Sequence, residues 1–184
     1  MRKIIILGPQ GCGKGTQATR LATLFGLQKI SMGQLLRDEV AAGTPMGKKI
    51  GNTVATGELV SDEIASEVLH QRLRQPDVMK GYILDGFPRD MKQYEAFEKF
   101  DSPTDVIVIT LPREKSVMRL LDRAQKEGRA DDTLEVINRR LEIYETDTQP
   151  VLNAYEERGI LRTIDGDASI DDVADRIAKM LTSA

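Results

Sequence analysis

The chain has 184 residues, of which 26 are lysine or arginine and 29 are aspartate or glutamate, so that its net charge at pH 7 is −3. This length is typical of one domain, and the near balance of charge excludes the strongly basic surface of a nucleic-acid-binding or membrane-binding protein. An anionic ligand must therefore meet a local cluster of cations. With one cysteine, Cys12, and one histidine, His70, the sequence excludes a disulfide framework and argues against a zinc site and histidine-based catalytic triads.

No stretch of the sequence predicts a membrane span or a secretory signal. The apolar opening run 4–7 ends at Gly8 and Pro9, far short of the roughly 20 apolar residues that a membrane helix needs. We therefore expect a protein of the cytoplasm, which agrees with a single unpaired thiol.

Apolar runs alternate with stretches of helical period along the chain. Continuous apolar runs predict strands buried on both faces, and apolar residues at i, i+3, i+4 and i+7 predict amphipathic helices. In chain order the predicted elements are a strand at 4–7, a helix over 18–25, a strand at 27–30, two helical pieces within 31–61, strands at 82–84 and 106–109, a helix over 117–124, a long helical stretch over 133–157, a strand at 160–164 and a helix over 170–181. This alternation is typical of an α/β fold, and we expect a five-stranded parallel sheet with helices on both faces.

Some of these elements carry local signals for their ends. Pro150 lies inside the long helical stretch and should kink or break it, because proline lacks the N–H donor and its ring crowds the preceding turn. Ser169 is the expected N-cap of the last helix, with Asp172 three residues on. The segment 31–61 is a candidate inserted subdomain, and the polar gap 125–132 is a candidate surface loop.

A glycine-rich loop, residues 8–16 with the sequence GPQGCGKGT, follows the first strand and opens the first helix. Its glycines let backbone N–H groups point at an anion, the helix N-terminus adds partial positive charge, and Lys14 places a full charge on the terminal phosphates. The alternative, a turn that binds nothing, requires the lysine, the glycines and both flanking elements to coincide by accident. Gly15 occupies the position where the general pattern has Ser or Thr, with Thr16 next, which speaks against direct magnesium ligation by that hydroxyl. Cys12 is either a small filler or a thiol whose oxidation would block phosphate binding.

An acidic residue, Asp85, ends the apolar run 82–84 at the edge where open α/β sheets bind ligands. There it would hold the hydrated magnesium that bridges the phosphates of a nucleotide. Taken alone, Asp85 could equally be a turn residue before Gly86. The phosphate loop at the same edge favours the metal role.

Further motifs occur in a fixed order over essentially the whole chain, at 11–17, 30–33 with Leu36 and Arg37, 57–63, 85–89, Gln93, 128–132, 139–141 and 165–166. This set resembles the adenylate kinase family and the related nucleoside monophosphate kinases. The resemblance implies one P-loop kinase domain over 1–184, with an inserted monophosphate-binding segment at about 31–60 and a short lid at about 124–132. It also implies ATP, AMP and ADP as substrates and Mg²⁺ with ATP, and the lid is too short for a zinc-binding hairpin.

The resemblance also implies roles for single residues. The ATP-binding residues would be Gly11, Cys12, Gly13, Lys14, Gly15, Thr16, Arg123 and Ala168. The AMP-binding residues, among which Arg37 and Arg89 would grip the phosphate and Gln93 would bind the adenine edge, would be Met32, Arg37, Glu58, Leu59, Val60, Gly86, Phe87, Pro88, Arg89, Gln93, Arg129 and Arg140. The catalytic residues would be Lys14, Arg89, Arg123, Arg129 and Arg140, with Asp85 holding Mg²⁺ through water.

The sequence departs from the family pattern at two positions near the acceptor. Met32 stands where threonine is usual beside the monophosphate, and Gln34 stands where an acid is usual. Family members that prefer UMP or CMP tend to have asparagine at the position of Gln93, so the glutamine favours AMP. The nearest alternative is a UMP or CMP kinase, supported by Met32, and more remote ones are a P-loop ATPase or switch and a catalytically dead nucleotide sensor.

Phosphoryl transfer to a monophosphate requires no general base from the protein. The acceptor is a phosphate that is largely ionised at pH 7, since its second pKa is about 6, and the reaction needs positioning and cations around the equatorial oxygens. Without the resemblance, Arg119 and Arg123 would be residues of a solvated helix face, and His70 a helix boundary residue. We expect a monomer, because no heptad seam or continuous apolar stripe is evident.

Overall fold

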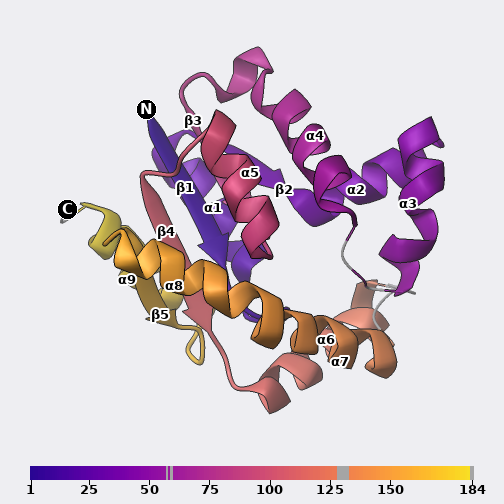
Figure 1. Ribbon diagram of the computed structural model, residues 1–184. Helices are drawn as coiled ribbons and strands as arrows, with labels where there is room; N and C mark the ends of the chain where they lie inside the picture. The colour runs from indigo at the N-terminus through magenta and orange to yellow at the C-terminus, as the bar shows by residue number, and fades with distance from the viewer. Residues whose placement is uncertain (57, 59, 128–132, 183–184) are drawn as a thin grey trace.

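The computed structural model describes residues 1–56, 58, 60–127 and 133–182 (Figure 1). Within these residues, parallel strands form a five-stranded sheet in the order β2-β3-β1-β4-β5. The strands lie where the sequence predicted them: β1 (Arg2–Leu7), β2 (Gln28–Ser31), β3 (Gly81–Asp85), β4 (Asp105–Thr110) and β5 (Leu161–Asp165). Because β1 pairs with β3 on one side and β4 on the other, the loop after β1 opens at the middle of the carboxyl edge.

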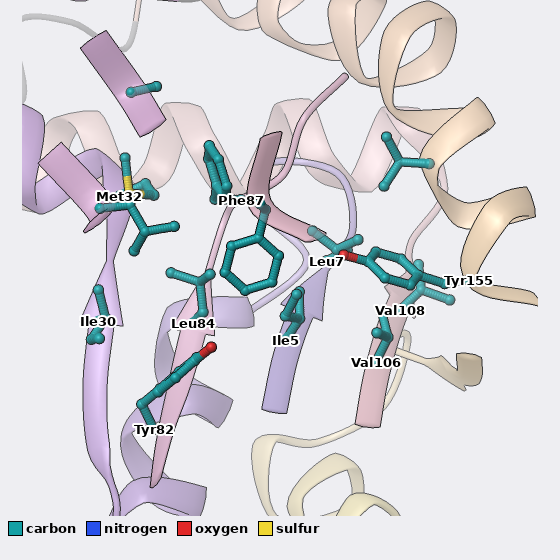
Figure 2. Packing of buried hydrophobic residues seen from close by; sticks show 14 of the residues in the cluster. Ile5, Leu7, Ile30, Met32, Tyr82, Leu84, Phe87, Val106, Val108 and Tyr155 are labelled. Carbon is teal, nitrogen blue, oxygen red and sulfur yellow. The ribbon is translucent and has the colours of Figure 1, made fainter. Parts of the chain in front are cut away.

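Helices cover both faces of the sheet (Figure 1). Successive residues of a strand point to opposite faces: Ile5 and Leu7 belong to one apolar cluster, and Ile4 and Ile6 to another. Figure 2 shows the first cluster, which runs from Ile30 on β2 across the sheet to β4. The prediction of strands buried on both sides is confirmed, since Ile4, Ile5 and Ile6 are all 0% exposed.

Each face has its own helices. The first cluster includes residues of α4 (Asp62–Leu73), α5 (Met91–Phe100) and α8 (Gln149–Glu157), and the second includes residues of α1 (Lys14–Phe25) and α9 (Ile170–Thr182). Ser169 caps α9 as predicted: the Asp172 N–H donates to Ser169 Oγ at 3.1 Å, and that hydroxyl donates to Asp172 Oδ2 at 2.6 Å. A 3₁₀ turn, η1 (Pro76–Val78), leads from α4 into β3.

Two helices, α2 (Met32–Ala41) and α3 (Pro45–Thr56), stand between β2 and α4, which confirms the two predicted helical pieces. α3 packs on α2, and α2 packs on β2 and α4. The two helices approach so closely that a Cβ atom at Gly47 would lie 1.9 Å from the carbonyl oxygen of Glu39. This pair extends away from the sheet (Figure 1).

The predicted interruption near Pro150 is present, in the form of a π-helical segment. α6 (Arg113–Glu127) packs on α7 (Leu134–Ile143), and α7 continues through η2 (Tyr144–Thr148), a π segment, into α8. Pro150 is the second residue of α8, and because the chain before it is already helical, its missing N–H removes one bond from a continuous helical stretch. The widened turns before it relieve the crowding by the proline ring, so the disturbance falls on the five residues of η2.

None of the helices in the described ranges is both long enough and apolar enough to cross a membrane.

Candidate active site

A large cleft lies along the carboxyl edge of the sheet. Its volume of about 1560 Å³ exceeds the roughly 300–1,000 Å³ of a site for one small molecule. Every predicted site residue that the structure describes lines this cleft: Gly11, Cys12, Gly13, Lys14, Gly15, Thr16, Met32, Arg37, Glu58, Val60, Asp85, Gly86, Phe87, Pro88, Arg89, Gln93, Arg123, Arg140 and Ala168. Leu59 and Arg129 lie outside the described residues, as does the predicted lid from residue 128 to 132.

The phosphate loop is held against the sheet by glycines with positive φ. A Cβ at Gly8 (φ 139°) would lie 2.3 Å from the Ile109 carbonyl oxygen, so only glycine fits between β1 and β4. Gly13 is the left-handed N-cap of α1, whose first N–H groups have no partner inside the helix. Lys14 Nζ donates to the carbonyl oxygens of Gly8 at 2.7 Å and Pro9 at 2.8 Å. One short stretch of chain therefore gathers the N–H groups of a helix N-terminus and an ammonium group at one point of the cleft.

Cys12 packs as part of the core beneath this loop. Its side chain is 3% exposed and belongs to the apolar cluster of α1 and α9. Burial raises the pKa of the Cys12 thiol above its usual value, although Lys14 opposes this shift. These observations favour the interpretation of Cys12 as a small filler.

The carboxylate of Asp85 lies beside the first turn of α1. A Cβ at Gly15 would be 3.5 Å from Asp85 Oδ2, so the glycine leaves this acid room next to the loop. Lys29, which the sequence analysis did not single out, also lines the cleft here. Its Nζ donates to the Gly15 carbonyl oxygen and to Thr19 Oγ1, both at 2.8 Å, and thereby ties β2 to α1.

Three arginines from separate elements, Arg37, Arg89 and Arg140, meet in the cleft. Burial holds the pKa of the Arg89 guanidinium below its ordinary value, the charges of Arg140 and Arg37 lower it further, and Asp85 partly offsets them. Like charges from three separate elements are costly to assemble unless an anion joins them, so this cluster is suited to binding a phosphate. Arg89 Nε is anchored on the Gly86 carbonyl oxygen at 2.9 Å, and the Phe87–Pro88 bond beside it is cis.

The backbone N–H and the carbonyl group of Arg89 are both held by hydrogen bonds. Its N–H donates to Gln93 Oε1 at 3.0 Å, and its carbonyl oxygen accepts from Thr148 Oγ1 at 2.7 Å. Thr148 is 3% exposed and is the last residue of the π segment η2. The π segment therefore supports the backbone of Arg89. The sequence carried no signal for Thr148 beyond the nearby Pro150.

Met32 and Gln34, the two residues of α2 that depart from the family pattern, each have defined surroundings in the structure. Met32 is 2% exposed and lines the cleft from the apolar core. Gln34 bridges its neighbours: its Oε1 accepts from Arg37 Nη2 at 2.9 Å, and its Nε2 donates to Asp38 Oδ1 at 2.7 Å. The carboxylate of Asp38 thus lies one hydrogen bond away from Gln34, near the position where the family pattern has an acid.

Two further arginines, outside the predicted set, line the cleft or contact a residue that lines it. Arg119 lines the cleft and donates from Nη2 to the Gly166 carbonyl oxygen at 3.2 Å, close to Ala168. Its position four residues before Arg123 on α6 was the available signal, although the sequence pattern alone favours a residue of a solvated helix face. Arg139 Nη2 lies 3.4 Å from Glu58 Oε1, a contact between exposed side chains that contributes little stability.

His70 takes no part in the site. It is exposed on α4, and its ring lies 4.8 Å from the ring of Phe100 on α5. The sequence predicted a boundary residue of a helix, and the structure places His70 on the exposed side of α4, in its last turn.

Two sets of cationic groups therefore face one cleft, and each has the chemistry to hold an anion. A parallel sheet with a phosphate loop after its central strand, an acid after the neighbouring strand and arginines opposite has the architecture of a P-loop phosphotransferase.

Comparison with known proteins gives the family. The model of the family described as adenylate kinase matches residues 6–160. The chain is similar to proteins named adenylate kinase from Xanthomonas euvesicatoria pv. vesicatoria (strain 85-10), at 47% identity, and Xylella fastidiosa (strain M12), at 44% identity; each match covers 97% of this chain and 98% of the relative. The chain belongs to the adenylate kinase family, and it is a phosphotransferase of the nucleoside monophosphate kinase class.

Proposed function

We propose that the protein transfers a phosphoryl group reversibly from ATP to AMP and so forms two molecules of ADP. The observation that carries this proposal is the pairing of two anion-binding sets across one cleft of about 1560 Å³. The phosphate loop supplies backbone N–H groups and Lys14, and the opposite wall supplies Arg37, Arg89 and Arg140. An enzyme that only hydrolyses one nucleotide has no use for the second set.

On the donor side, residues 11–16 wrap the phosphates of ATP, and Lys14 exchanges its bonds to Gly8 and Pro9 for phosphate oxygens. Arg123 from α6 holds the same nucleotide, and Ala168 contacts its base through the backbone or by van der Waals contact. Arg119, fixed on Gly166, stands beside them.

On the acceptor side, Arg37 and Arg89 grip the phosphate of AMP, because a planar guanidinium can bind two phosphate oxygens and stays charged at any working pH. Gln93 binds the edge of the adenine base, and the other residues around AMP are Met32, Glu58, Leu59, Val60, Gly86, Phe87 and Pro88. Arg140, and Arg129 beyond the described residues, reach over the phosphoryl group in transfer.

Asp85 is the residue that would hold Mg²⁺, through water, between the loop and the acceptor. Its carboxylate beside the first turn of α1 fits a cation that takes one or two protein carboxylates and completes its shell with phosphates and water. The described residues contain no group of three or more side chains that could bind a metal unaided. When bound, Mg²⁺ neutralises charge that develops on the β- and γ-phosphate oxygens.

The protein's own residues contribute to the reaction by positioning the two substrates. The acceptor phosphate is already ionised, so no proton has to be removed by a side chain. The site has to align the two phosphates and exclude water, which would otherwise compete with AMP for the γ-phosphoryl group. We assign that closure to the segment 31–60, whose helices pack mainly on one another and on α4, and to a lid at 124–132.

A coupled assay of ADP formation from MgATP tests the proposal, with AMP, UMP, CMP, GMP and no acceptor run separately. We expect ADP formation that depends on AMP and is at least tenfold slower with the other acceptors. A preference for UMP or CMP would keep the mechanism and move the base assignment. ADP release without any acceptor would replace the transferase with a hydrolase. A monomer in the cytoplasm stays a prediction, which gel filtration and cell fractionation address.

A further inference from the structure

Two hydrogen bonds fix the orientation of the Gln93 side-chain amide. Its Oε1 accepts from the Arg89 N–H at 3.0 Å, and its Nε2 donates to Asp62 Oδ1 at 3.2 Å. A backbone N–H can only donate and an ionised carboxylate can only accept, so a reversed amide would lose both bonds. Gln93 is 2% exposed but lines the cleft.

The fixed amide leaves one N–H and one oxygen lone pair for a ligand. A glutamine amide presents this donor and acceptor pair to adenine, whose N6 donates and whose N7 accepts. Guanine presents two acceptors, O6 and N7, along the corresponding edge. The orientation of the Gln93 amide therefore bears on which purine the site accepts.

We propose that Asp62 is a positioning residue for base selectivity: its carboxylate fixes the Gln93 amide in the orientation that favours AMP over GMP. This inference rests on the proposed function, in which Gln93 binds the acceptor base. Asp62 is the first residue of α4 and is not among the residues that line the cleft, so it acts through Gln93.

The surroundings of Asp62 support a role beyond holding the helix. A second acid, Asp90, caps α5 by accepting the Gln93 N–H at 2.9 Å, and its carboxyl is a hydrogen-bond neighbour of Asp62. Burial raises the pKa of Asp90, the Gln93 N–H opposes the shift, and Asp62 adds to it. Two carboxyls side by side cost stability, and a local conflict of this kind is expected where a residue serves function.

The first turn of α4 also offers a control. Glu63 follows Asp62 in the same turn and is exposed, so it shares the favourable interaction with the helix N-terminus but has no bond to Gln93 in the structure. Glu63→Ala thus removes an acid from the same helix end without touching the acceptor site.

The test measures kcat/KM for AMP and for GMP, KM for ATP, and the melting temperature. Asp62→Ala should lower kcat/KM for AMP about tenfold. It should also reduce the selectivity ratio, that is, kcat/KM for AMP divided by kcat/KM for GMP, and leave KM for ATP unchanged. Asp62→Asn should keep most of the ratio, because its side-chain carbonyl can accept the same N–H. Should the alanine variant fail to fold, Asp62→Ser, whose hydroxyl ends short of Nε2, gives the same readout.

A double-mutant cycle with Gln93→Ala completes the test. In the Gln93→Ala background, Asp62→Ala should change the ratio of AMP to GMP no further, since the two residues act as one unit. The inference is wrong if Asp62→Ala keeps the ratio while Gln93→Ala loses it, or if Glu63→Ala loses as much of the ratio as Asp62→Ala. If Gln93→Ala itself keeps the ratio, the base-binding role in the proposed function fails instead.

Discussion

The two cationic regions of the cleft are built in opposite ways. The phosphate loop is one run of nine residues, 8–16, whose glycines fit against the sheet and whose lysine bonds to its own loop. The acceptor region takes Arg37 from α2, Arg89 from the segment after β3 and Arg140 from α7. A phosphate held by backbone groups depends on local chain geometry, whereas one held by distant side chains depends on how helices pack. Substitutions should therefore impair phosphate binding by the loop mainly when they remove charge. They should impair the acceptor region mainly when they shift its helices slightly.

The largest expected effect belongs to the loop. Lys14→Met should lower kcat for AMP phosphorylation by about 10²–10³-fold, because it removes the full charge on the transferring phosphates. The fold should persist, since the glycines that seat the loop remain. The coupled assay measures the rate, and circular dichroism with thermal unfolding reports the fold. Lys99→Met, an exposed lysine on α5, is the control, and a Lys14→Met rate above one tenth of the parent would refute the phosphate role.

An intermediate effect should come from the packing of α2 on α3. Gly47→Ala would place a methyl group 1.9 Å from the Glu39 carbonyl oxygen, so the helices must part at a cost of about 1–3 kcal/mol. Arg37 moves with α2, and kcat/KM for AMP should therefore fall about tenfold while KM for ATP changes little.

Gly51→Ala is the matched control on the same helix. Its methyl would meet Val40 Cγ1 at 3.9 Å, an ordinary contact, and alanine favours a helix by about 0.5–1 kcal/mol over glycine. It should leave AMP kinetics unchanged and raise the melting temperature slightly. Equal kinetics for the two variants would contradict the dependence of acceptor binding on helix packing.

The smallest expected effect concerns stability and pH. The pKa of Asp90 is raised, chiefly by burial, so the folded protein holds this proton more tightly than the unfolded chain does. Its contribution is favourable below the ordinary aspartate pKa of about 3.9 and is lost as pH rises through the raised value.

Asp90→Asn still caps α5, because asparagine is as good an N-cap as aspartate. The variant should melt about 1–3 °C higher than the parent at pH 7, since the carboxyl is only partly buried. Thermal unfolding between pH 4.5 and 7.5 should show this advantage shrink as pH falls. An advantage that grows toward acid pH would reverse the assigned direction.

More of the loop side than of the acceptor side could be derived from the residues alone, and the reason is physical. Local rules of glycine conformation, apolar runs and helix capping located the strands, the phosphate loop and the cap at Ser169. The roles on the acceptor side came from the family resemblance, because residues such as Arg37 and Arg140 meet only after the helices pack.

Contacts between residues far apart in the chain escaped the sequence analysis for the same reason. The hydroxyl of Thr148 bonds to a carbonyl 59 residues earlier, and Asp62 bonds to Gln93 across 31 residues. Neither residue type signals such a role by itself. Pro150 predicted an interruption correctly, but not that a π segment would place Thr148 beneath Arg89.

The place of β1 at the centre of the sheet has a consequence for how the chain acquires its shape during synthesis. Its partners are residues 81–85 on one side and 105–108 on the other. A ribosome that adds about 5–20 residues per second needs roughly 5–20 seconds after the first strand emerges to produce the second partner. β1 is thus made well before its second partner, and it is paired on both sides only after residues 105–108 have been made. Until then its four consecutive apolar residues, 4–7, are exposed to chaperones and to neighbouring chains.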